Sequence, residues 1–95
     1  MNGLEVVRET ADLRVSRCAT DDGDLVEVLV RLVPPGPLLD FPRTRAAVDA
    51  LEILSRRGFE VRPGEGGWAV CEKRLRPGEG EAECLAVLGT LAHFG

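Results

Sequence analysis

The chain has 95 residues, of which 44% are hydrophobic and 29% are charged, and its formal net charge is −4. A chain of this length has room for one hydrophobic core, and this composition excludes the low-hydrophobicity, high-charge pattern of disordered proteins. We therefore expect one domain spanning residues 1–95. The net negative charge argues against nucleic acid or an anionic membrane as a partner.

The sequence carries no feature of export or membrane insertion. No apolar run approaches the roughly 18 residues of a membrane-spanning helix, and the first residues lack the basic and apolar stretches of a secretory signal. The cysteines Cys18, Cys71 and Cys84 are odd in number and widely spaced, unlike the disulfide framework of small secreted proteins. These features predict a cytoplasmic protein.

The first part of the chain predicts a β-hairpin. Apolar residues occur between positions 4 and 7 and again between 13 and 15, and the residues at 9–12 form a polar break. The β-branched valines in both segments favour strands. A helix over residues 4–18 is the competing interpretation, with one apolar stripe made of Leu4, Val7, Ala11 and Val15.

A turn and a central strand are predicted next. Asp22 and Gly23 lie between apolar runs, and glycine accepts the positive φ that tight turns need. Residues 25–33 then alternate so that one face is entirely apolar. Its members are Val26, Val28, Val30 and Leu32. This pattern predicts a central strand that faces the core.

The segment that follows is rich in proline, which ends the strand because proline donates no hydrogen bond to a sheet. Three apolar side chains, Leu38, Leu39 and Phe41, lie in this segment outside regular structure. They either cover the core as a connector or form an exposed apolar patch. The second interpretation makes Leu38, Leu39 and Phe41 candidate residues for binding a protein partner or a second copy of the chain.

An amphipathic helix is predicted over residues 43–57, with an apolar stripe along one side. The stripe consists of Ala47, Ala50, Leu51 and Leu54, widened by Val48 and Ile53. Gly58 lies where a left-handed C-terminal cap belongs. Phe59 follows it and is expected to contact Leu54, as apolar residues beyond such caps do.

A second hairpin is predicted from residues 59–62 and 68–75, and a final helix from residues 81–94. The pentapeptide Arg-Pro-Gly-Glu-Gly occurs at 62–66 and again at 76–80. Because Pro-Gly fits the central positions of a type II turn, we expect the same turn chemistry in both copies. An eight-residue strand between them separates the loops by about 25 Å, which argues against one composite site.

The sequence carries no catalytic signature. The only histidine is His93, and no residue pattern indicates a nucleophile beside a base. His93 and the three cysteines lack the short spacings of a zinc site, so the cysteines are expected to fill the core as small apolar residues. We expect no catalytic residue, no metal and no cofactor.

The predicted order is βββ-α-ββ-α, an α+β two-layer sandwich with a mainly antiparallel five-stranded sheet and two helices on one face. The order is similar to that of several small α+β superfolds, including secretion-chaperone-like and ferredoxin-like sandwiches, and such a similarity supplies no function. The leading hypothesis is a non-enzymatic interaction or ligand-binding domain that self-associates into a homo-oligomer, through a sheet edge or through residues 38–41. The alternatives are an accessory subunit or enzyme that uses carboxylates with a partner-supplied cofactor, and an arginine-mediated nucleic-acid binder.

Overall fold

The structure is a computed structural model that describes residues 3–33 and 41–94. The elements follow the predicted βββ-α-ββ-α order. They are β1 (Glu5–Glu9), β2 (Leu13–Thr20), β3 (Gly23–Arg31), α1 (Phe41–Arg56), β4 (Glu60–Pro63), β5 (Trp68–Leu75) and α2 (Gly80–Thr90).

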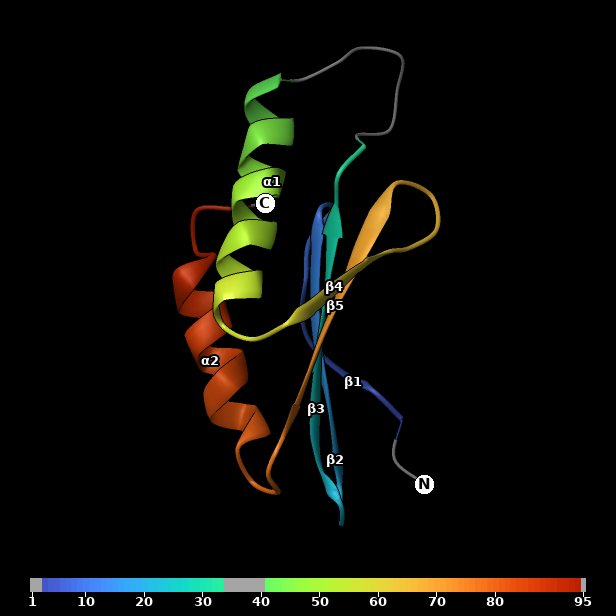
Figure 1. The fold of residues 1–95 in the computed structure, drawn as a ribbon, viewed down its shortest axis with the longest axis vertical. Helices are drawn as coiled ribbons and strands as arrows, with labels where there is room; N and C mark the ends of the chain where they lie inside the picture. The colour runs from blue at the N-terminus through green and yellow to red at the C-terminus, as the bar shows by residue number, and fades with distance from the viewer. Residues whose placement is uncertain (1–2, 34–40, 95) are drawn as a thin grey trace.

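The strands form one antiparallel five-stranded sheet in the order β1-β2-β3-β5-β4, which confirms the predicted fold class. Both helices lie on the same side of this sheet (Figure 1), where α1 packs over β3 and β4 and α2 packs over β2 and β3. Val26, Val28 and Val30 of the central strand are fully buried beneath the helices. The alternation in β3 therefore identified both the central strand and its covered face.

The first hairpin is confirmed, and the alternative helix over residues 4–18 is wrong. Residues of β2 pair with β1 on one side and with β3 on the other, so Val15 gains sheet partners and a place in the core together. Several boundaries differ from the prediction, and the largest difference is in α2, which ends at Thr90 rather than at residue 94. Helix α1 begins at Phe41 rather than at residue 43, because Pro42 fits the first turn of a helix, and β3 ends at Arg31 rather than at residue 33.

The end of α1 has the predicted left-handed cap. Gly58 has a φ of +96°, and its N–H donates to the carbonyl of Ser55 at 3.0 Å. The N–H of Phe59 donates to the carbonyl of Leu54, also at 3.0 Å, which completes a Schellman motif. Phe59 and Leu54 both belong to the buried core, so the cap turns the chain directly into the second hairpin.

The two copies of Arg-Pro-Gly-Glu-Gly adopt different conformations, contrary to the prediction. In the second copy Gly78 has a φ of +89° and the Glu79 N–H donates to the Arg76 carbonyl, as in the expected type II turn. In the first copy Pro63 still pairs with Ala69, so the sheet ladder continues past the Pro-Gly step. The turn is displaced to Gly66 and Gly67, whose positive φ values of 62° and 81° fit a type I′ hairpin turn.

The N-terminus of α2 is capped from the sheet. The carboxylate of the buried Asp24 on β3 accepts the N–H of Gly80 at 2.7 Å and the N–H of Gly78 at 3.1 Å. A carboxylate at this end of a helix satisfies unpaired N–H groups and complements the helix dipole. A Cβ at Gly80 would lie 2.8 Å from an Asp24 carboxylate oxygen, so the position requires glycine for this close approach.

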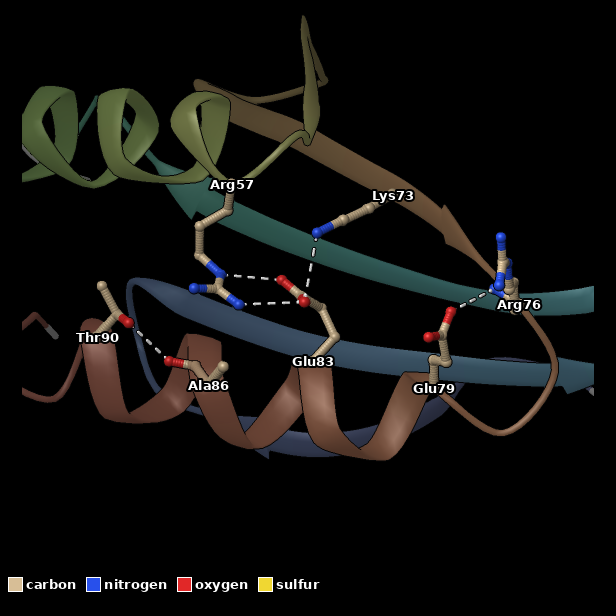
Figure 2. Close-up of polar contacts among 7 residues, drawn as sticks. All are labelled: Arg57, Lys73, Arg76, Glu79, Glu83, Ala86 and Thr90. Atoms are coloured by element: carbon tan, nitrogen blue, oxygen red, sulfur yellow. Dashed lines mark hydrogen bonds and ion pairs between the residues drawn. The ribbon is translucent and has the colours of Figure 1, made fainter.

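Glu83 joins both helices to the sheet. Its carboxylate, only 10% exposed, accepts two hydrogen bonds from Arg57 at 2.9 and 3.1 Å, and it lies 3.3 Å from Nζ of Lys73 on β5. Figure 2 shows Arg57 and Lys73 converging on this carboxylate from α1 and β5. Burial alone would raise the pKa of Glu83, but the hydrogen bonds and charges of Arg57 and Lys73 outweigh it and lower that pKa below 4.5.

Replacing Glu83 by Gln should lower the free energy of unfolding by about 2 kcal/mol at neutral pH, because two partly buried cations lose their counter-charge. A carboxyl group whose pKa is lower in the folded state than in the unfolded state stabilises the protein at pH values above its unfolded-state pKa. This stabilisation is lost as the pH falls through the folded-state pKa. The difference between wild type and Glu83→Gln, measured by urea unfolding, should therefore shrink below pH 4.5.

The matched control is Glu52→Gln, which breaks the exposed pair with Arg56 within α1. We expect its effect to stay within about 0.5 kcal/mol, as for other exposed pairs on one helix. Equal losses in the two variants would mean that Glu83 has no special role in joining the layers.

Candidate functional site

The residues predicted to bind a partner fall largely outside the described part of the chain. Leu38 and Leu39 lie between residues 34 and 40, which the structure does not describe. Phe41 opens α1, and only its backbone is described. The hypothesis for Leu38, Leu39 and Phe41 stays a prediction. Two other candidate surfaces lie among the residues that the structure describes.

The two edges of the sheet differ in character. Strand β1 forms one edge, and all five of its residues are exposed, including Val6 at 49% and Val7 at 39%. Strand β4 forms the other edge with four residues, and Pro63 ends it. Both edges carry charged side chains, which protect a strand edge from pairing, but only β4 also contains a proline.

A β-bulge in β1 changes which of its residues share a face. The pairing with β2 shifts between Val6 and Arg8, so Glu5 lies opposite Arg17 and Arg8 lies opposite Val15. Arg17 and Val15 are two residues apart on one strand and therefore share a face. Glu5 and Arg8 consequently point to the same face of the sheet, although residues three apart on a regular strand point to opposite faces.

An apolar patch continues from the β1 edge onto α2. Val6 and Val7 line a hollow of about 230 Å³ together with Cys84 and Leu85 of α2. Leu85 is 63% exposed, although leucine is a residue that folded proteins usually bury. We call Val6, Val7 and Leu85 the β1 patch. The ion pair of Arg17 with Glu81, 3.7 Å long, lies beside it.

The other face of the sheet is not covered by any helix or strand of residues 3–33 and 41–94 (Figure 1). A hollow of about 480 Å³ lies on it near the two hairpin turns, and we call it the Arg31 hollow. Its floor is apolar and contains Leu29, Val70 and Trp68. Its charged residues are Arg31, Arg14, Glu9 and Glu65.

Arg31 is held over Trp68 without an ionic partner. The two residues are paired across β3 and β5, and the guanidinium carbon lies 4.6 Å from the centroid of the indole ring, within range of a cation–π contact. The Nε atom of Arg31 is buried and has no hydrogen-bond partner among the described residues. By contrast Arg14, in the same hollow, is paired with Glu9. One of the two arginines in the hollow is thus left without a carboxylate.

Three carboxylates form a row across the middle of the uncovered face. Glu27 of β3 lies opposite Glu72 of β5, which in turn lies opposite Glu60 of β4. Arg62 donates to Glu72 at 2.7 and 3.1 Å and offsets part of this charge. Partial burial is the main cause that raises the pKa of Glu27 above 4.5, and the charge of Glu72 raises it further. The row therefore weakens the sheet rather than stabilising it.

The cysteines and the histidine do not come together. Cys71 and Cys84 fill the core as expected, whereas Cys18 on β2 is only partly buried and does not belong to the core. Burial raises the pKa of the Cys71 thiol to about 11, which keeps it protonated and unreactive. His93 is exposed after the end of α2. Within residues 3–33 and 41–94, no three His, Cys, Asp or Glu side chains are grouped so that they can hold a metal ion. No helix of the described chain is long and apolar enough to span a membrane.

Comparison with known proteins adds no assignment: no protein-family model, no curated protein and no solved structure matches this chain. The sequence reasoning missed the Arg31 hollow because Arg31 and Trp68 meet only through the pairing of β3 with β5. Trp68 was the available signal, since it is the only tryptophan and directly follows a glycine-rich turn. The strand order was needed to find its partner.

Replacing Glu27 by Gln should raise the free energy of unfolding at neutral pH by about 0.5 kcal/mol, because it removes a like-charge contact with Glu72. The pKa of Glu27 is higher in the folded state than in the unfolded state, so ionisation of Glu27 destabilises the fold. This destabilisation appears as the pH rises through 4.5. The gain should therefore vanish at pH 3, where wild-type Glu27 is protonated. Urea unfolding at both pH values checks this, and a variant that is less stable than wild type at neutral pH would contradict it.

Proposed function

We propose that this chain is a non-enzymatic interaction domain that forms a homodimer through the β1 edge. The observation that carries the proposal is an edge strand without proline whose five residues are all exposed, with an apolar patch beside it. An open edge offers a row of unpaired N–H and C=O groups to a further strand. A second copy of β1 can satisfy these groups by antiparallel pairing.

The charges of β1 support a second copy as the occupant. Neither Glu5 nor Arg8 forms an ion pair with another described residue. A two-fold axis perpendicular to the sheet between Val6 and Val7 pairs Glu5 of each chain with Arg8 of the second copy. The bulge makes this match possible, because it brings Glu5 and Arg8 onto one face. The strand is thus complementary to itself in charge as well as in hydrogen bonding.

The same axis leaves both pairs of helices on one face of a continuous ten-stranded sheet. Helix α2 is the helix nearer to β1, since it packs over β2 and β3. Leu85 then faces the second copy from beside the new strand pair, and its exposure in the single chain has an explanation. Because the pairing involves a strand of only five residues, the interface is small, and we expect the dimer to dissociate on dilution.

Sedimentation velocity over a dilution series tests the proposal. Wild type should shift from dimer to monomer as it is diluted, and Val7→Lys should weaken the dimer by about tenfold or more, because the lysines of the two copies lie close to each other across the two-fold axis and repel. The matched control is Val61→Lys, which places the same charge on the β4 edge at a residue that is 42% exposed. Wild type that stays monomeric at every concentration, or equal effects of the two variants, would contradict dimerisation through β1.

Exchanging the charges of Glu5 and Arg8 distinguishes a disrupted strand pairing from a general loss of folding. Glu5→Arg alone should weaken the dimer, because it places two arginines opposite each other at each end of the strand pair. The double variant Glu5→Arg with Arg8→Glu should restore it. Failure of the double variant to recover would rule out the pairing of Glu5 with Arg8, even if dimers form in another register.

A further inference from the structure

The uncovered face of the sheet carries a second feature that is independent of the β1 edge. In the Arg31 hollow an apolar floor lies beside a guanidinium that lacks an acceptor. Arg31 forms no ion pair and no hydrogen bond through its side chain with any described residue, and within the same residues its guanidinium lies against the face of Trp68. Its Nε is buried, and a buried donor without an acceptor is rare in folded proteins.

The terminal nitrogens of Arg31 remain available. They are not among the buried atoms that lack a partner, and no described residue accepts from them, so they face the hollow or the solvent. Trp68 contacts the guanidinium from one side. This contact restricts the position of the Arg31 side chain while its terminal nitrogens stay free for an anion, and arginine binds carboxylates through such paired N–H donors.

The charges that line the hollow limit the ligand to one negative charge. Arg14 is already paired with Glu9, and this pair contributes no net charge. Glu65 also lines the hollow, so a dianion such as phosphate would meet an unpaired carboxylate as well as a single unpaired arginine. A monoanion balances Arg31 with the least repulsion from Glu65.

The remaining surface of the hollow favours a ligand whose uncharged part is apolar. Leu29, Val70 and the indole of Trp68 form the floor, and all three are only partly exposed. A volume of about 480 Å³ is in the range of small-molecule sites in proteins. We propose that the Arg31 hollow binds a small apolar monocarboxylate, with its carboxylate on the terminal nitrogens of Arg31 and its hydrocarbon chain over Leu29 and Val70.

Heteronuclear NMR tests this directly, because Trp68 is the only tryptophan and gives a single indole N–H signal. We would titrate the protein with hexanoate and with hexan-1-ol, which share a chain length and differ in charge. Hexanoate should move the Trp68 signal and bind at least about tenfold more tightly than hexan-1-ol, because only the carboxylate pairs with Arg31. Equal affinities, or no shift with hexanoate at concentrations where its micelles are absent, would overturn the proposal.

Three variants locate the binding. Arg31→Gln should weaken hexanoate about tenfold and leave hexan-1-ol unchanged. Glu65→Gln should strengthen hexanoate, since it removes a like charge from an exposed residue without touching the fold. Arg45→Gln, at an exposed arginine on α1, is the control and should change nothing. An Arg45→Gln effect as large as that of Arg31→Gln would show an unspecific charge effect and reject the site.

The wild-type comparison of hexanoate with hexan-1-ol requires no variant, so it decides the proposal even if Arg31→Gln fails to fold. The outcome is also separate from dimerisation. A protein that binds hexanoate but stays monomeric at every concentration supports this site and contradicts the β1 dimer, whereas a dimer indifferent to hexanoate does the reverse.

Discussion

The layered arrangement depends on one buried carboxylate. Glu83 lies on α2, Arg57 directly follows α1, and Lys73 lies on β5, so a single ionic cluster fixes three elements relative to one another. A buried carboxylate is tolerated only when its oxygens are paired, which makes the relative placement of these elements specific rather than merely apolar. Both helices therefore lie on the same face of the sheet, and no helix or strand of the described residues covers the opposite face.

The division between the two faces explains where the chain carries features that do not stabilise the fold. On the helix side the carboxylates of Asp24 and Glu83 are buried and paired with N–H groups or cations. On the other side Glu27 and Glu72 lie opposite each other, and Arg31 has no carboxylate partner within residues 3–33 and 41–94. Because like charges across a sheet and orphaned donors both cost stability, these residues are not accounted for by folding alone.

The sequence predicted well wherever a pattern is local. The alternation of β3 and the cap at Gly58 each depend on neighbours within one element or one turn, and both agree with the structure. The pairing of Arg57 with Glu83 joins residues 26 positions apart, and nothing in the sequence distinguishes Glu83 from Glu81, which is exposed. The repeated pentapeptide makes the same point, since identical residues turn differently when one copy is held in a sheet ladder and the other precedes a helix.

The candidate surfaces were the least predictable part, because each is formed by residues that the topology brings together. The prediction of a sheet edge as an interaction surface was general, and only the strand order and the bulge identify β1 and its self-complementary charges. The bulge is also what makes β1 different from an ordinary edge strand. Bulges usually twist an edge away from pairing, but here the shift aligns an acidic and a basic side chain on one face. An edge protected against arbitrary strands is therefore open to one particular strand, a second copy of itself.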